Sequence, residues 1–153
     1  MPGLIGFVAS SAVPAPERLL ASMARALESE GRFQVDLHQE ATWGLGRVSL
    51  GILNPHPQPI WDAGQTLGIV MEGELYDTRE LRRGRQFVTD SDAELVLQLY
   101  AEHGEACACQ LNGAFTAAIW DRRAQKLTVI NDRLGLYPLY YAQVDGRLLF
   151  ASG

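Results

Sequence analysis

Three short stretches of the chain hold residue types that can do chemistry. They are "MEGELYD" at residues 71–77, "TDSDAEL" at 89–95 and "NDRLGLYPLYY" at 131–141. In the first, Gly73 follows an apolar run typical of a buried strand, and a glycine there lets the backbone approach a ligand closely. An ordinary β-bulge explains the same glycine, so the spacing alone leaves both interpretations open.

The other two stretches also allow a structural interpretation. Asp90 and Asp92 are suited to gripping an ammonium group, but the residues taken alone favour ordinary N-capping by Ser91 of a helix that acidic residues stabilise at its start. In the third stretch we expect Asp132 to pair with the adjacent arginine, while Gly135 and Pro138 shape a turn.

Metal binding and the familiar nucleophilic triads find no support in the sequence. Cys107 and Cys109 lie two residues apart, and the three histidines are isolated from them. No metal-ligand spacing follows, and no serine or cysteine has a visible histidine partner. We expect no metal site, two unbridged cysteines and a reducing compartment, the cytoplasm.

The elements that must position these stretches predict an α+β domain. We expect helices at 17–29, just after Asp77 with Glu80 completing a capping box, at 92–102 behind Ser91 and Glu94, and near Cys107. We expect strands at 4–9, 33–38, 46–53, 67–76, 114–121, 126–132, 136–143 and 147–152, with an irregular loop at 54–60. Antiparallel sheets with helices outside them fit this order.

Composition bounds the function. The 153 residues carry a net charge of −5, and their arginines are scattered except at residues 80–85, interpreted as a solvated helix end. Nucleic-acid binding is disfavoured, and no apolar run is long enough for a membrane span. The N-terminus lacks the pattern of a secretory signal. Because the chain stops directly after a strand at "FASG", we expect residues 1–153 to be one domain cut from a longer protein.

Taken in order, the motifs resemble those of the N-terminal glutaminase domain of asparagine synthetase-like amidotransferases, a class II glutamine amidotransferase. The motifs are "MPGLIG" at 1–6, "EGELYD" at 72–77, "SDAE" at 91–94, "LNGAF" at 111–115, "DRLGLYPLYY" at 132–141 and "FASG" at 150–153. The resemblance implies an N-terminal-nucleophile (Ntn) hydrolase fold, a four-layer αββα sandwich. It also implies a glutaminase in which an N-terminal cysteine attacks the glutamine amide and ammonia passes to an ATP-using domain.

The sequence departs from this family at two positions. Pro2 occupies the place of the nucleophilic cysteine, and proline has no thiol. Glu72 occupies the place of the asparagine that stabilises the oxyanion, where a carboxylate would repel the developing charge. The resemblance therefore implies no catalytic residue here, as in β-lactam synthetases, whose first domain is a vestigial scaffold.

A vestigial substrate pocket is still expected from the resemblance. Arg47 matches the arginine that binds the glutamine carboxylate, Asp92 matches the acid that holds the ammonium, and Gly73 retains a backbone donor. Tyr137 stands where the family has lysine. We therefore expect glutamine or another amino acid as a possible ligand, and no cofactor in this domain.

Three functions remain open at this point. The first is a silent glutaminase-like domain of an amide-forming enzyme, with ATP and magnesium confined to a C-terminal synthetase domain that is also its partner. The second is a non-catalytic amino-acid-binding or scaffold module, and a homodimer is possible in either case. The third is unconventional catalysis by the secondary amine of Pro2 after removal of the initiator methionine.

Overall fold

Two antiparallel sheets form the centre of the molecule. The computed structural model describes residues 2–28 and 32–152 of the chain. One sheet has five strands in the order β2-β3-β1-β9-β8, and the other has four in the order β4-β5-β6-β7. The predicted α+β class is confirmed.

The elements follow one another in a simple order. The strands are β1 (Gly3–Ala9), β2 (Gln34–Gln39), β3 (Trp43–Ser49), β4 (Ile60–Trp61), β5 (Leu67–Leu75), β6 (Gly113–Asp121), β7 (Lys126–Asn131), β8 (Leu139–Val144) and β9 (Arg147–Ser152). The helices are α1 (Pro16–Leu27), α2 (Arg79–Arg82), α3 (Asp92–His103) and the 3-10 helix η1 (Gly104–Gln110).

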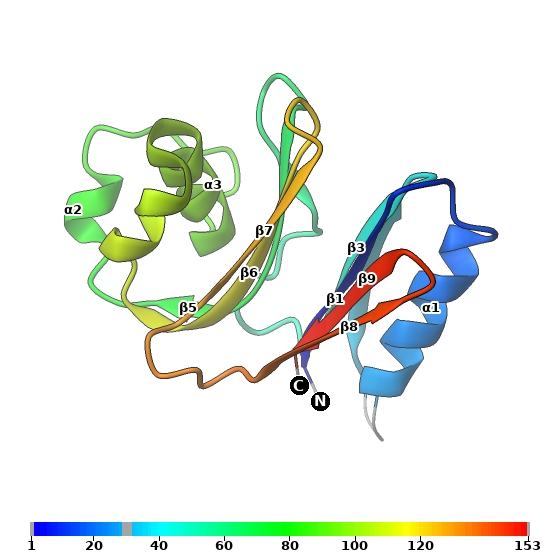
Figure 1. Cartoon of the computed structure of the whole chain (residues 1–153). Coiled ribbons are helices and arrows are strands. Elements are labelled where there is room, and N and C mark those ends of the chain that lie inside the picture. The colour runs from blue at the N-terminus through cyan, green and yellow to red at the C-terminus, as the bar shows by residue number, and fades with distance from the viewer. Residues whose placement is uncertain (1, 29–31, 153) are drawn as a thin grey trace.

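The sheets are stacked face to face and the helices cover their outer sides. Figure 1 shows α1 against the five-stranded sheet and α2 and α3 on the side of the four-stranded sheet. Between the sheets, Trp43 stacks on Trp120 with ring centroids 4.9 Å apart, in a cluster with Leu4, Val70 and Phe150. Apolar burial from both faces stabilises this arrangement, and the expected four-layer αββα sandwich is observed.

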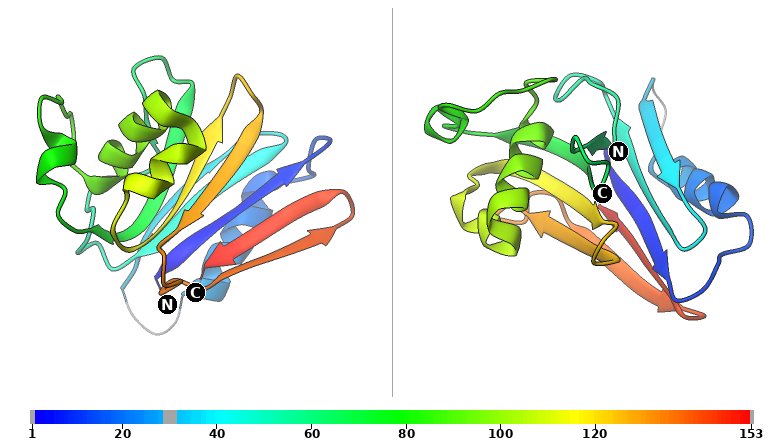
Figure 2. Two further views of the ribbon diagram at one scale, coloured as in Figure 1. Left: turned by 60° about the vertical axis from the view of Figure 1, so that its left-hand side comes forward. Right: turned by 90° about the horizontal axis from the view of Figure 1, so that it is seen from above.

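Strand β1 enters the core at once because it is the middle strand of its sheet. It pairs with β3 on one side and β9 on the other, and residues 3–7 are buried. The pairing with β9 brings the two chain ends together, as both views of Figure 2 show. Only glycine fits at residue 3, since a Cβ there would lie 1.8 Å from the Ser152 carbonyl oxygen.

Two predicted strands are shorter than expected. In both cases the residues left out of the strand, 50–53 and 136–138, form loops instead. The strand predicted at 46–53 is β3, which ends at Ser49, because Gly51 and Asn54 adopt positive φ angles of 72° and 48°. The strand predicted to start at 136 starts at Leu139, since the Asp132 carboxylate accepts hydrogen bonds from the N–H groups of Leu134 and Leu136 and holds a loop.

Some local predictions are wrong for identifiable reasons. Asp77 does not cap α2; its φ is 55°, and the N-cap residue is Thr78, whose hydroxyl accepts from Arg82 and makes no capping bond. Asp132 does not pair with Arg133, which instead donates to the Cys109 carbonyl oxygen. The loop predicted at 54–60 contains the start of β4, because Ile60 pairs with Ile69.

Helix α3 starts as predicted. The Ser91 hydroxyl accepts a hydrogen bond from the Glu94 N–H at 3.1 Å. The Glu94 carboxylate, however, accepts from the N–H groups of Val88 and Thr89, so the second half of the predicted capping box is absent. The helix predicted at 17–29 is α1, and the end of that prediction lies outside the described residues.

Arginines 82 and 85 are more than a solvated helix end. Arg82 pairs with Asp90 and Asp92, and Arg85 makes a bidentate pair with Glu102. The cluster at 80–85 lies at the end of α2 as predicted, and its two partly buried arginines also tie that end to α3.

Candidate functional site

A mostly apolar pocket of about 430 Å³ lies where β1 begins, at the ends of β3 and β5 and beside the loop before β8. Its wall consists of Pro2, Leu50, Ile52, Leu53, Glu72, Leu136, Tyr137 and Pro138. Leu50–Leu53 and Leu136–Pro138 are the two segments that were predicted to be strand. Because they leave the sheets as loops, they form the rim of the pocket.

Pro2 lies directly before the central strand β1. It is half-buried and lines the pocket directly before Gly3. Its ring holds no thiol or hydroxyl, so its side chain cannot form an acyl intermediate.

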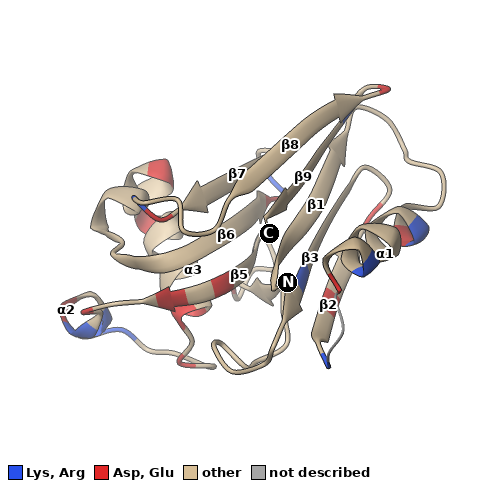
Figure 3. Cartoon of the chain, turned by 90° about the horizontal axis from the view of Figure 1, so that it is seen from below, with Lys and Arg blue, Asp and Glu red and all other residues tan. Residues whose placement is uncertain are grey.

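Glu72 is the one carboxyl group in the wall. It belongs to β5, which Figure 3 shows with acidic positions near its end, and only 4% of the residue is exposed. Burial raises the pKa of Glu72, opposed by a hydrogen bond with Ser49 and by the charge of Arg47. Its Oε2 atom has no hydrogen-bond partner among the described residues.

Arg47 is fully buried and is bound by the protein itself. Its Nε and Nη2 atoms donate to the Asp36 carboxylate at 3.0 and 2.7 Å. Nη1 donates to the Asn54 carbonyl oxygen at 2.7 Å and Nη2 to that of His56 at 3.1 Å. Four of its five N–H donors are thus used within the chain.

Asp92 is engaged in a similar way. Its Oδ2 atom accepts from the Leu75 N–H at 2.8 Å, and Oδ1 accepts from Arg82 at 2.6 Å. The carboxylate thus fixes the end of β5 to the start of α3. It is not among the residues that line the pocket.

Gly73 lies where β5 passes close to β6. Its φ is 100°, and a Cβ atom would lie 2.1 Å from the Ala114 carbonyl oxygen. Only glycine tolerates both conditions. The Gly73 carbonyl oxygen accepts a hydrogen bond from the Asn54 side chain at 2.8 Å.

Asn54 joins these residues, and the sequence analysis missed it. Its Nδ2 binds the Gly73 carbonyl, its Oδ1 accepts from the Asp92 N–H at 2.8 Å, and its own carbonyl accepts from Arg47. Its positive φ is one that asparagine tolerates well. The signal was the Asn-Pro pair in the proline-rich loop, since asparagine in turns often bonds neighbouring backbone.

The predicted site residues therefore form two groups. Pro2 and Glu72 share the pocket, and Tyr137 lies in its wall, where burial and then the nearby Glu72 raise the pKa of the phenol. Arg47, Gly73 and Asp92 form the second group around Asn54, which we call the Asn54 network and define by these residues with Asp36. Arg47 is the link, because its charge acts on Glu72.

Other kinds of site are not seen in the described ranges. Among residues 2–28 and 32–152, no three His, Cys, Asp or Glu side chains are grouped so as to hold a metal ion. No helix in those ranges has the length and apolarity to cross a membrane. Cys107 and Cys109 are both free thiols.

Comparison with known proteins agrees with this architecture. The family model described as "Glutamine amidotransferase domain" matches residues 1–153. Asparagine synthetase [glutamine-hydrolyzing] 2 of Bacillus subtilis is 30% identical over 155 residues, which cover 98% of this chain and 21% of the relative.

Two fungal proteins are also similar. Amidase chyE of Penicillium rubens is 38% identical over 118 residues, covering 72% of this chain and 18% of its own. Amidase chry2 of Gibberella zeae is 35% identical over 135 residues, covering 84% and 20%. The chain thus spans about a fifth of the length of these curated relatives. Its sheets, its order of motifs and its match over the full length show that the chain belongs to the glutamine amidotransferase domain family, related to asparagine synthetases and fungal amidases.

Proposed function

We infer that this chain is a degenerate glutaminase domain that keeps the amidotransferase architecture without hydrolysing glutamine. The observation that carries the proposal is Pro2, which stands at the head of the central strand and lines the pocket. Glutaminases of this family need an N-terminal thiol there. A ring without a nucleophilic side-chain atom removes the covalent route.

Glu72 supports the same conclusion. A buried carboxyl group with an unpartnered oxygen replaces the amide donor expected for the oxyanion. Loss of one such donor costs about 10²- to 10³-fold in rate, and a negative charge adds repulsion. Restoring activity therefore needs changes at both positions.

The larger assignment follows from the relatives. Since the chain spans about a fifth of their length, we propose a parent enzyme that forms amides with ATP and magnesium in a C-terminal synthetase domain. The present domain would be its scaffold and contact partner, in the cytoplasm. No cofactor is proposed for the chain itself, and a homodimer remains a proposal.

The alternative, an amino-acid-binding module, is less well supported. A bound amino acid would need Arg47 for its carboxylate and Asp92 for its ammonium. Both side chains already have short internal partners at 2.6 to 3.0 Å. Binding would require these partners to be displaced.

Glutamine hydrolysis tests the proposal. The purified chain is incubated with glutamine, and glutamate and ammonia are measured beside a double variant, P2C with E72N, whose processed N-terminus is verified by mass spectrometry. We expect no product from the natural chain and measurable product from the double variant. Turnover by the natural chain that Pro2→Ala abolishes would overturn the proposal and favour catalysis by the Pro2 amine.

A further inference from the structure

One ionisable carboxyl group, that of Glu72, stands in the otherwise apolar and aromatic wall of the pocket. Seven of its eight lining residues are apolar or aromatic, and the eighth is Glu72. Glu72 is more than nine-tenths buried, and its Oε2 atom has no partner among the described residues. A buried carboxyl group that lacks donors costs free energy, and a donor brought to that carboxyl group from the pocket would recover part of it.

The charges around Glu72 favour a cation rather than an anion. Arg47 from β3 is the positive group whose charge acts on Glu72, but it is bound to the Asp36 carboxylate from β2 at 2.7 Å. Asp36 therefore balances Arg47, and the carboxylate form of Glu72 adds one uncompensated negative charge. Ser49 and Tyr137 complete the surroundings without charge of opposite sign.

The apolar side chains around the opening indicate that the remainder of the ligand is apolar. Leu50, Ile52 and Leu136 are 54%, 74% and 58% exposed, although their side chains are apolar. They lie on two loops that border the opening, so an apolar body would bury them. A volume of about 430 Å³ is of the size that small-molecule ligands occupy.

We propose that this pocket binds a small primary amine with an apolar tail, whose ammonium group donates to Glu72 while the tail contacts the loops at residues 50–53 and 136–138. This ligand class differs from glutamine, whose α-carboxylate meets no cationic side chain among the residues that line the pocket. The assignment does not depend on whether glutamine hydrolysis has been lost, since it concerns binding alone.

Calorimetry on the full chain with simple probes tests the assignment. Hexylamine, which is protonated at pH 8, is titrated beside hexan-1-ol, hexanoate and glutamine. We expect hexylamine to bind about 10- to 100-fold more tightly than hexanol, as one charge-assisted hydrogen bond allows, and hexanoate to bind no more tightly than hexanol. Equal affinity for hexylamine and hexanol, or tighter binding of glutamine, would overturn the proposal.

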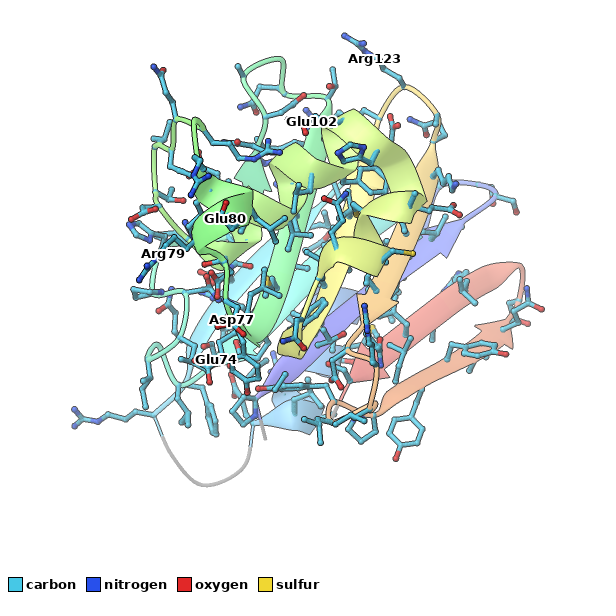
Figure 4. All side chains as sticks on the ribbon, turned by 90° about the vertical axis from the view of Figure 1, so that its left-hand side faces the viewer. Glu74, Asp77, Arg79, Glu80, Glu102 and Arg123 are labelled. Carbon is cyan, nitrogen blue, oxygen red and sulfur yellow. The ribbon has the colours of Figure 1, made fainter. Side chains whose placement is uncertain are left out.

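Matched variants locate the binding. Glu72→Gln should lower hexylamine affinity by a similar factor of about 10 to 100. Glu74→Gln on the same strand should not change it, because Glu74, which Figure 4 labels, is exposed and is not among the residues that line the pocket. Leu136→Ala should weaken binding several-fold, and Leu134→Ala, 83% exposed and outside the wall, should not. The four variants are checked for unchanged circular dichroism. Hexylamine affinity that Glu72→Gln and Leu136→Ala leave intact would place the amine elsewhere and reject the assignment.

Discussion

The Asn54 network and the apolar pocket lie next to each other and differ in how their polar groups are satisfied. In the network, Arg47, Asp92 and Asn54 all have short internal partners. In the pocket wall, one buried oxygen of Glu72 has no hydrogen-bond partner within residues 2–28 and 32–152. Arg47 and Asp92, which were expected to bind a substrate, instead form hydrogen bonds that hold strands and loops of this domain together. Glu72, which was expected to prevent catalysis, is the residue whose carboxyl group is left without a donor for one oxygen among the described residues.

The largest effect is expected from removing Asp36, the carboxylate that pairs with Arg47 in the Asn54 network. Arg47 would keep its full burial with only carbonyl acceptors, and an unpaired buried charge typically costs about 3–5 kcal/mol. We expect Asp36→Ala to lower the free energy of unfolding by that amount in a urea titration. Glu80→Ala, which removes the exposed pair with Arg83, should change it by less than about 1 kcal/mol. Similar losses for the two variants would mean that Arg47 does not depend on its buried partner.

Asn54 tests whether the network acts as one unit. Asn54→Ala removes two side-chain hydrogen bonds of 2.8 Å and places alanine at a positive φ. We expect a loss of about 2–3 kcal/mol in unfolding free energy.

The control for Asn54 is another asparagine. Asn112 is exposed, and only its backbone carbonyl makes a hydrogen bond in the described contacts. Asn112→Ala should therefore leave stability nearly unchanged, and a loss equal to that of Asn54→Ala would contradict a special role for the network.

Glu72 gives the smallest effect, of opposite sign and dependent on pH. The folded protein binds the Glu72 proton more tightly than the unfolded chain, because burial raises the pKa of Glu72. The contribution of Glu72 to stability therefore falls as pH rises above about 4.3, the value of an unperturbed glutamate. We expect Glu72→Gln to be more stable than the natural chain by about 1 kcal/mol at pH 8, with the gap narrowing toward pH 4.

Thermal unfolding of the two proteins across that range measures the gap. Glu74→Gln serves as the control because Glu74 lies exposed two residues along the same strand. If the stability difference between Glu72→Gln and the natural chain stays constant with pH, or if Glu74→Gln produces the same difference, burial does not raise the pKa of Glu72.

Much of the fold could be predicted from local patterns. Alternation in β2 and the apolar runs of β1 and β5 identified strands, and Ser91 marked the start of α3. The strand ends at Ser49 and Leu139 were missed, because apolar residues such as Leu50 and Leu136 continue the strand pattern while lining an open pocket. Local periodicity does not distinguish an apolar residue in a core from one at a rim.

The site was harder to predict than the fold. The order of the motifs indicated Pro2, Arg47, Glu72 and Asp92. It did not indicate which charged side chains form ion pairs with Arg47 and Asp92 in the folded chain. Asp36 alternates with apolar neighbours in β2 as an ordinary strand residue, and only the pairing of Asp36 with Arg47 across β2 and β3 joins their charges. Asn54 was missed for the same reason, since its partners lie 19 and 38 residues away.

The pairing of β1 with β9 has a consequence for synthesis. Ile5 is aligned with Ala151, and the Leu4 N–H donates to the Ser152 hydroxyl. Since β1 is made long before β9, the five-stranded sheet cannot be completed until β9 has been synthesised, and contacts so distant along the chain slow folding. During that interval β1 carries apolar residues and an unpaired edge, a segment that is prone to aggregation.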